Sequence, residues 1–218
     1  MALQRILLND EFTGVDATAL TAHWPNKIYN RAAANVMATW STLHAIPVIT
    51  SNAASPALEA TNYSAVVDLG RQNLHIIADM RTGSNGAGDE DWIKFLFRVK
   101  DVNDMIAVQV GKTSDAGIFR ILDFIGGTAY VRDSRVLTYA ASTDYHVDIQ
   151  CTGNLIQASV SDGGKDVIWS MKPTFPQVAI TAGQNFRAPG TYVGFWQYIS
   201  ATVVSSLFPI VYNFKVLG

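Results

Sequence analysis

The strongest constraint on the fold is the stretch DWIKFLFRVKDVNDMIAVQVG, residues 91–111, in which apolar side chains recur at every second position. In the first half of this stretch, one side carries only apolar residues: Ile93, Phe95, Phe97 and Val99. The other side is mixed and carries Trp92, Lys94, Leu96, Arg98 and Lys100. A period of two predicts a half-buried β-strand. Because the alternation resumes in phase after residue 104, the sequence predicts a hairpin with one core face.

The polar cluster at residues 101–104 predicts a four-residue hairpin loop, with Lys100 facing Met105 across it. This register puts apolar side chains of both strands on one face, which is what fixes the register of a half-buried sheet. The expected pairs are Val99 with Ile106, Phe97 with Val108, and Phe95 with Val110.

Similar short alternating runs recur along the whole chain, separated by Gly, Asn and Asp turns. They cover residues 5–8, 64–69, 74–80, 93–99, 106–110, 118–124, 129–132, 146–151, 156–160, 167–171, 192–196 and 211–216. Strands at this frequency predict an all-β sandwich or barrel. Helical signals are weak, with one or two turns expected after Asp16 as N-cap.

The length and the net charge of the chain limit the classes of function that it can have. The chain has 218 residues, 49% of them hydrophobic, which suits one large all-β domain over residues 1–218. A net charge of -2 without basic runs argues against nucleic-acid binding, which depends on Lys and Arg that neutralise phosphates. No apolar run approaches the roughly 20 residues of a membrane helix, and MALQRILLND lacks the features of a signal peptide. We expect no membrane insertion and synthesis in the cytoplasm.

The single cysteine, Cys151, excludes an internal disulfide framework. It alternates with Val147 and Ile149, which predicts a thiol packed in the core. The four histidines lack the i, i+4 or His-x-His spacing of local metal sites, so no histidine metal site is expected.

The order of segments resembles the concanavalin A-like (laminin-G-like) jelly-roll family, of the kind found in bacteriophage virion proteins. LLNDEFTGVDATALTAHW looks like the opening strand and turn, WIKFLFRVKDVNDMIAVQVG the central hairpin, and YHVDIQCTGNLIQASVSDGGKDVIWS a later meander. GTYVGFWQYIS followed by VYNFKVLG is similar to the closing pair. The resemblance implies a two-sheet antiparallel jelly-roll sandwich with its first and last strands adjacent. The segment from Arg31 to Asn62 does not align, and its role stays open.

Some members of this family are glycoside hydrolases, and retaining hydrolysis needs two carboxyl groups about 5–5.5 Å apart. The family's hydrolases carry an E-x-D-x-x-E run, which this chain lacks; its glutamates lie in separate segments: Glu11, Glu59 and Glu90. Two aspartate pairs are close in sequence, in predicted turns typical of solvated acids: Asp89 with Asp91, and Asp101 with Asp104. We expect no catalytic residues and a non-enzymatic protein, with a glycoside hydrolase-like enzyme as the third hypothesis.

The mixed face of the hairpin predicts carbohydrate binding, because aromatic rings stack on sugars while amide and cationic groups hydrogen-bond to hydroxyls. In GFWQYIS the alternation puts two aromatic side chains on one side, opposite Phe195. The candidate carbohydrate-binding residues are Trp92, Arg98, Gln109, Trp196 and Tyr198.

The glycine-rich loop RTGSNGAGDED, residues 81–91, ends in three acids. Carboxylate oxygens on a flexible turn suit calcium, so Asp89, Glu90 and Asp91 are a calcium candidate. A plain solvated loop is the alternative, because the spacing of an EF-hand is absent. No other cofactor is expected.

The stretch YISATVVSSLFPIVYNF, residues 198–214, carries no charge, which is unusual on the surface of a monomer. It predicts either two core strands with their connection, or a contact with other virion proteins or a second copy. Free-standing jelly rolls of this kind recur in phage tails, fibres and capsid decorations. We therefore interpret the protein as a non-enzymatic structural or adhesion component of a phage virion that contacts surface glycan. A cellular carbohydrate-binding module is the alternative.

Overall fold

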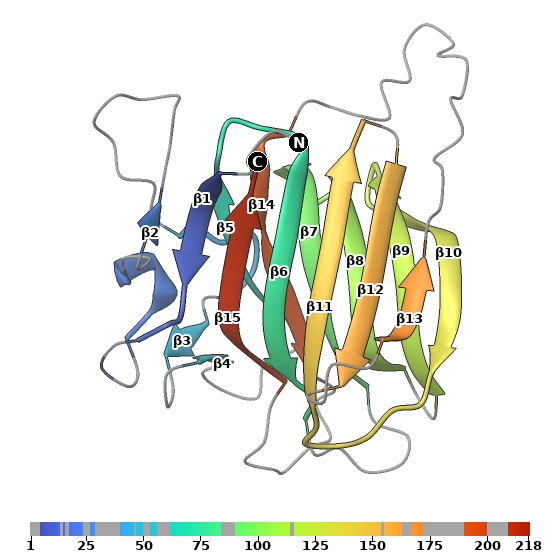
Figure 1. The fold of residues 1–218 in the computed structure, drawn as a ribbon. Coiled ribbons are helices and arrows are strands. Elements are labelled where there is room, and N and C mark those ends of the chain that lie inside the picture. Colours follow the sequence, from blue (N-terminus) through green and yellow to red (C-terminus); the bar gives the residue numbers. More distant parts are fainter. Residues whose placement is uncertain are drawn as a thin grey trace, which may run out of the picture.

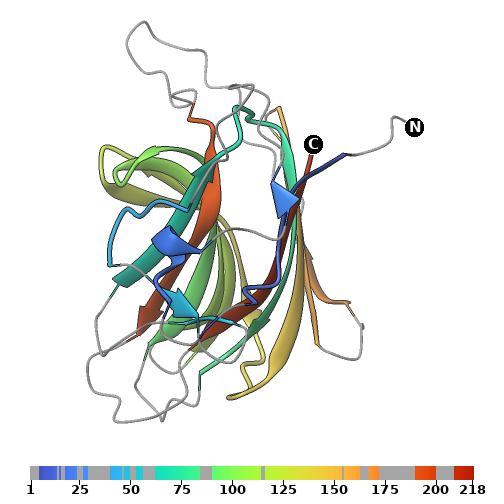
Figure 2. The same cartoon turned by 90° about the vertical axis from the view of Figure 1, so that its left-hand side faces the viewer.

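The computed structural model describes residues 5–13, 15, 18–23, 27–28, 40–45, 47–49, 53–55, 62–83, 90–113, 116–153, 155–162, 167–171, 190–199 and 209–218. These residues form two antiparallel sheets that face each other, as the two views in Figures 1 and 2 show.

The nine-stranded sheet lies in front in Figure 1, and its main order is β13-β12-β11-β6-β15-β1-β2. In that order the strands are β13 (Val167–Met171), β12 (Leu155–Asp162), β11 (Asp144–Thr152), β6 (Leu74–Arg81), β15 (Ile210–Leu217), β1 (Ile6–Asp10) and β2 (Lys27–Ile28). Two short strands extend it, because β4 (Ala54–Ser55) pairs with β15 and β3 (Val48–Ile49) pairs with β4.

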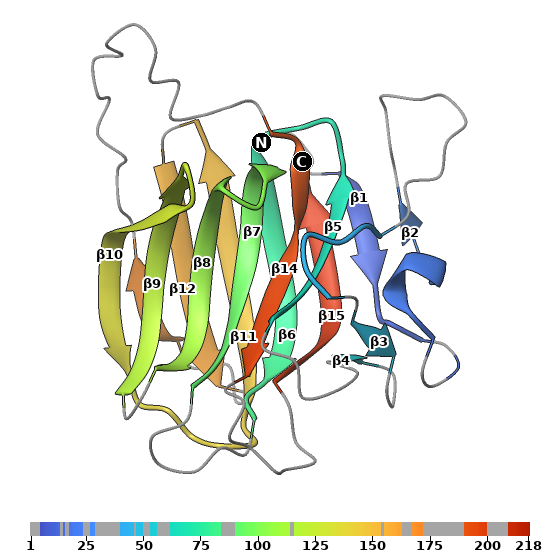
Figure 3. The same ribbon diagram turned by 180° about the vertical axis from the view of Figure 1, so that it is seen from behind.

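The six-stranded sheet faces the viewer in Figure 3. Its strands, in spatial order, are β10 (Thr128–Leu137), β9 (Ala116–Ile125), β8 (Asp104–Thr113), β7 (Asp91–Asp101), β14 (Tyr192–Ile199) and β5 (Asn62–Asp68).

The strand prediction is confirmed, since every predicted run overlaps an observed strand. The predicted meander is β11-β12-β13, in which each strand pairs with the next. β1 pairs with β15, so the first and last described strands are adjacent and neither leaves that edge bare. The fold is an antiparallel two-sheet jelly-roll sandwich.

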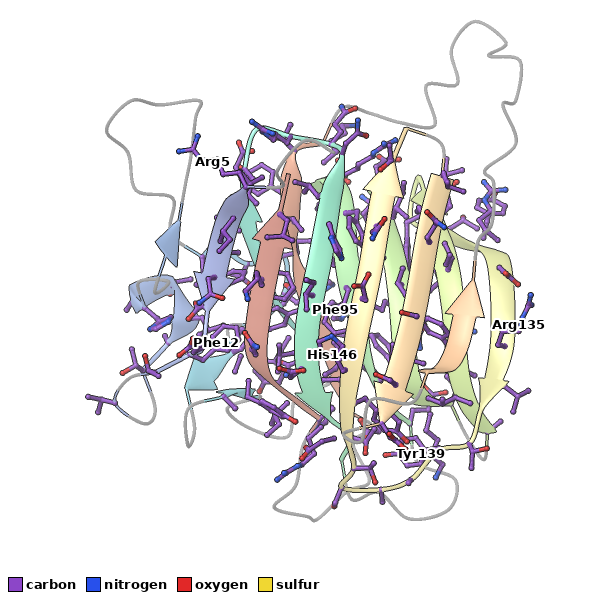
Figure 4. The ribbon with its side chains drawn as sticks, viewed as in Figure 1. Arg5, Phe12, Phe95, Arg135, Tyr139 and His146 are labelled. Carbon is purple, nitrogen blue, oxygen red and sulfur yellow. The ribbon has the colours of Figure 1, made fainter. Side chains whose placement is uncertain are left out.

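The core lies between the sheets and is built from the side chains that each strand turns inward. Phe95 of β7 is fully buried there (Figure 4), and its ring lies 6.5 Å from that of Phe214 on β15, across the sandwich. The ring of Phe195 on β14 lies edge-on to that of Phe214, with the two ring centroids 5.7 Å apart. Cys151 is 1% exposed within this core, as predicted.

The predicted four-residue loop and the predicted register of the central hairpin are both wrong. Asp101 and Asp104, which were expected in the loop, pair with each other, so the connection between the strands is only two residues long. Further along, Phe97 pairs with Ile106 instead of Val108. Between these pairs three residues of β7 lie opposite one residue of β8, which is an irregularity of the β-bulge type.

The bulge contains Arg98, whose φ of 49° is rare for a residue with a side chain. Beyond it the side chain of Val99 changes face and packs with Leu96 and Met105 on the outside of the sheet. Gly190 lies against this bulge, where a Cβ would overlap the carbonyl groups of Arg98 and Val99. The prediction that Val99 belongs to the inner face is therefore wrong.

Two predicted features lie partly outside the described residues. Asp16, the expected N-cap, is not among them, and the helical signal reduces to one 3-10 turn, η1 (Leu20–Ala22). The uncharged stretch 198–214 begins in β14 and ends in β15, while residues 200–208 are not described. In the described part of the chain, no helix has the length and apolar character to cross a membrane.

The described part of residues 31–62 is anchored to the sandwich by a buried polar network. The indole Nε1 of Trp40 donates to Oδ2 of Asp10 (2.7 Å), and Trp40 is 1% exposed. Asp10 Oδ1 also accepts the backbone N–H of Phe12 (2.8 Å) and lies 2.9 Å from Nε2 of His23. This network satisfies a fully buried carboxylate and holds the segment beside β1.

Candidate functional site: the outer face of the six-stranded sheet

Side chains on the outer face of the six-stranded sheet form rows that cross the strands visible in Figure 3. The middle row is Arg120, Gln109, Lys94, Trp196 and Ser64, from β9 to β5. The row on one side is Gly111, Trp92, Tyr198 and Asn62, and the row on the other is Leu122, Ala107, Leu96, Gly194 and Val66. Four of the five predicted carbohydrate-binding residues thus share one face.

The ammonium group of Lys94 lies among three aromatic rings at the centre of this face. Its Nζ is 3.6 Å from the ring centroid of Trp92, 4.0 Å from that of Trp196 and 5.3 Å from that of Phe124. The two indole rings are 5.5 Å apart at an interplanar angle of 73°. A cation over an aromatic face is attracted by the ring quadrupole. We call these four residues the aromatic box.

Two further rings flank the aromatic box. Tyr198 stacks on Trp92 with centroids 4.8 Å apart and an angle of 11°, so it covers the ring face opposite Lys94. His44 stacks on Trp196 at 4.4 Å and 24°. Trp92 is consequently only 7% exposed and Phe124 is 9% exposed, whereas the rings of Trp196, Tyr198 and His44 are half-buried. Those three rings are the part of the cluster that solvent reaches.

Hydrogen bonds fix the rings at the margin of the box. Residues 41–45 run beside β5, and the backbone N–H of His44 donates to Oγ of Ser64 (2.9 Å). The indole Nε1 of Trp196 donates to Oδ1 of Asn62 (2.8 Å). The orientation of both rings is therefore set by β5.

The charges on this face are poorly hydrated. Burial, then the positive charge of Arg120, lower the pKa of Lys94 to about 7, while the charge of Glu90 raises it. Burial also lowers the pKa of Arg120. The pKa of His44 is lowered by burial and then by Lys94. The ring contacts of Lys94 favour its charged form and so oppose the effect of burial.

Gln109 lies between the two cations and is fully buried. Its Oε1 accepts a hydrogen bond from Nε of Arg120 (3.0 Å). Its Nε2 has no hydrogen-bond partner among the residues that the structure describes. A buried donor without a partner is uncommon, because leaving it unsatisfied costs free energy.

Arg98, the fifth predicted residue, lies apart from this group. It is 6% exposed, and its guanidinium reaches the turns of the opposite sheet. Its Nη2 donates to Oδ1 of Asn73 (3.1 Å) and to the carbonyl of Gly153 (2.7 Å), and its Nε donates to the carbonyl of Gln72 (3.3 Å). Arg98 thus links β7 to the turns that precede β6 and follow β11.

Of the calcium candidates Asp89, Glu90 and Asp91, the first lies outside the described residues. Asp91 is 1% exposed, and its Oδ2 accepts the hydroxyl of Tyr139 (2.6 Å; Tyr139 is labelled in Figure 4). Burial raises its pKa to about 6, against the effects of Tyr139 and of the charge on Lys112. Among described residues, no cluster of three or more His, Cys, Asp or Glu is arranged to hold a metal ion. The calcium site stays a prediction.

The second aspartate pair considered for hydrolysis belongs to the β7–β8 turn. Oδ1 of Asp101 accepts the backbone N–H groups of Asn103 (2.8 Å) and Asp104 (3.1 Å). Nζ of Lys100 lies 3.7 Å from Asp101 and 3.6 Å from Asp104. These carboxylates stabilise a tight turn at the surface.

The outer face of the nine-stranded sheet is polar, and its aspartates contact histidine or arginine side chains on the neighbouring strand. The pairs are His146 with Asp79 (2.6 Å; His146 is labelled in Figure 4), His75 with Asp148 (2.9 Å), and Arg81 with Asp144 (2.7 Å). Arg81 and Asp144 are opposite charges on neighbouring strands, and such a pair stabilises a sheet. We assign no binding role to this face.

Sequence reasoning places Lys94 on the mixed face but does not single it out, because a lysine in an alternating strand is usually solvated. His44 comes from a segment that does not resemble the family. Phe124 comes from a strand two removed from β7. Its spacing from Arg120 and Leu122 was the available signal, since residues at every second position share a face.

No protein-family model matches the sequence, and no curated protein matches it. Solved structures do match. The CBM2 module of the evolved Dit of Lactobacillus casei BL23 phage J-1 has a TM-score of 0.63 at 12% identity and covers 98% of this chain and 95% of that one.

Two further solved structures resemble the chain. The exoplasmic/lumenal domain of VIP36, in its Ca2+/Man3GlcNAc-bound form, has a TM-score of 0.56 at 9% identity, with 82% of each chain covered. Xylan beta-1,4-xylosidase from Bacillus halodurans C-125 has a TM-score of 0.51 at 9% identity, but the match spans 33% of the xylosidase chain. At these identities the likenesses concern the fold. They confirm a two-sheet jelly-roll sandwich, an architecture shared with a carbohydrate-binding module and a glycan-bound domain.

Proposed function

We propose that this protein is a non-enzymatic adhesion component of a phage virion, and that it binds glycan on the outer face of the six-stranded sheet. The observation that carries the glycan-binding part is the group of half-buried rings formed by Trp196 of the aromatic box with Tyr198 and His44 beside it. Sugar rings stack on such apolar surfaces, and nearby polar groups fix their orientation.

The position of Tyr198 makes it the best ring to test. One of its faces packs on Trp92, and the side chain is half-buried, so the opposite side is directed away from the aromatic box. Trp92 is enclosed between Lys94 and Tyr198, so its role in this proposal is to support the ring of Tyr198. In this proposal Arg98 contributes to the fold and not to the glycan contact.

A glycan array probed with the unaltered protein and with Tyr198→Ala tests this assignment. We expect at least a tenfold loss of binding, since stacking on an aromatic ring supplies much of the contact. Tyr130→Ala is the matched control, because Tyr130 is 47% exposed on β10 at the far edge of the same sheet. Equal binding by all three proteins would contradict the assignment, and so would the absence of any glycan bound by the unaltered protein.

The virion part of the proposal is supported by the similarity to the phage Dit module, which extends over nearly the whole of both chains. It predicts that the protein sediments with purified particles of the phage that encodes it. A cellular carbohydrate-binding module, the alternative, would remain in the particle-free fraction. Mass spectrometry of both fractions separates the two.

Strand β10 supports assembly with a second copy. In the described part of the sheet it pairs with β9 alone, and it exposes apolar side chains at Val136 (72%) and Val131 (54%). An exposed edge strand is a template for a strand of another chain. Antiparallel pairing of two β10 strands about their centre would set Arg132 of one copy opposite Asp133 of the other.

Light scattering tests this part of the proposal. We expect an oligomer that Val136→Lys weakens, because a charge at an exposed edge position opposes strand pairing. A monomer at all concentrations would contradict self-assembly. In that case the register shift between Val131 and Asp133 would serve to protect the edge strand from pairing with another chain.

A further inference from the structure

The middle row of the outer face brings two cations and one amide together on three neighbouring strands. Arg120 pairs with Gln109, and Gln109 pairs with Lys94. Neighbouring strands are about 4.8 Å apart, so the two cationic side chains leave the sheet at positions about 10 Å apart, with the amide between them.

The hydrogen-bonding groups that Arg120, Gln109 and Lys94 can offer to a ligand are all donors. Arg120 donates to Oε1 of Gln109, which uses the acceptor of the amide and directs its Nε2 away from Arg120. That Nε2 is buried and has no partner among the described residues. Guanidinium and ammonium groups carry donors and no acceptor. A ligand that completes this row must therefore bring acceptors.

The charges in the row also favour an anion. Burial lowers the pKa of Lys94 and repulsion by Arg120 lowers it further, so the two cations share one poorly hydrated region. Glu90 offsets this in part, and His44, whose pKa is lowered by burial and by Lys94, adds no charge at neutral pH. A negative ligand group would relieve the repulsion and replace part of the lost hydration.

We propose that the row formed by Arg120, Gln109 and Lys94 binds the oxyanion of an acidic glycan, with the sugar rings on the adjacent aromatic side chains. This inference rests on the proposed glycan-binding function and adds the class of ligand. The oxyanion is a carboxylate of a uronic acid or a phosphate of a polyol-phosphate polymer. Both present acceptors in a compact group, so the row does not distinguish them.

Calorimetric titration with three probes tests the inference: polygalacturonate, a glycerol-phosphate polymer and neutral mannan. We expect at least one acidic probe to bind tenfold or more tightly than mannan, and whichever acidic probe binds identifies the source of the oxyanion. Its affinity should fall with added salt and should be lower at pH 8.5 than at pH 6, because Lys94 loses its charge between these values.

Two variants assign the selectivity to the row. Arg120→Met and Gln109→Leu should each weaken the acidic probe tenfold or more and leave mannan binding unchanged; Arg120 is half-buried, so its variant tests the row even if Gln109→Leu does not fold. Lys100→Met, in the exposed β7–β8 turn, is the matched control and should change neither. Equal affinity for acidic and neutral probes would overturn the inference while the proposed function stands. Failure of all three probes, together with an empty glycan array, would overturn both.

Discussion

Lys94 illustrates at the residue scale how burial couples a charge to folding. Its pKa lies near 7 in the folded protein against a usual 10.5, so between these values the unfolded chain holds a proton that the folded protein has lost. Stability therefore rises with pH in this window. We expect this group to raise the free energy of unfolding by about 2 kcal/mol between pH 7 and 9, measured by chemical denaturation.

Lys94→Met should abolish that rise, because methionine keeps most of the length and packing of the side chain without its charge. Lys100→Met is the control, since Lys100 is exposed in a turn, and it should leave the rise intact. A pH dependence that is unchanged in Lys94→Met would show that Lys94 keeps an ordinary pKa among the rings.

The pH dependence of stability that Asp91 causes has the opposite sign to that of Lys94. Burial raises its pKa to about 6, so the folded protein holds a proton that the unfolded chain releases near pH 4. Stability from this group is present below pH 4 and is lost as pH rises through 6. In the unaltered protein, Asp91 should lower the free energy of unfolding by about 2 kcal/mol between pH 4 and 6. We expect Asp91→Asn to remove this decrease. Identical slopes in both proteins would contradict a buried Asp91 with a raised pKa.

At the scale of elements, the β-bulge in β7 connects the two sheets. It directs Arg98 to three acceptors in the turns beside β6 and β11: Gln72, Asn73 and Gly153. Arg98→Ala should lower the free energy of unfolding by about 2–3 kcal/mol, because charged hydrogen bonds are lost and buried acceptors are left without a donor. Arg135→Ala, on the exposed edge strand in Figure 4, should change it by less than about 0.5 kcal/mol.

Hydrogen exchange gives this prediction a local readout. In Arg98→Ala the amides of residues 70–74 and 151–153 should lose protection before those of the central strands. Uniform loss of protection, or equal stability of the two arginine variants, would contradict the role of Arg98 as a link between the sheets.

The strands could be predicted from the sequence because each depends on a local period of two. The bulge could not be predicted in that way. Its position depends on contacts that Arg98 makes with turns distant in the sequence, and on the approach of Gly190. The error then propagated, because a changed register moves side chains such as Val99 to the other face. The same error made Arg98 look like part of the mixed outer face.

At the scale of the whole molecule, the candidate site was predictable only where it follows one strand or one hairpin. Trp196 and Tyr198 share a side of β14, and Trp92 lies beside them on β7, as the alternation indicated. The aromatic box also needs Phe124 from β9, and His44 packs against it from residues 40–45. Which distant segments meet is set by the strand order, and the alternation of a single strand carries no information about that order.

The central claim is that glycan binds over the aromatic box, and the indole N–H signals of the tryptophans test it directly by NMR. Titration with the glycan bound most strongly on the array should shift the signal of Trp196, whose Nε1 donates to Asn62 at the margin of the box, and that of Trp92. The signal of Trp40, whose Nε1 donates to buried Asp10 inside the sandwich, should not move. Saturable binding that leaves Trp92 and Trp196 unshifted would place the glycan elsewhere and contradict the claim.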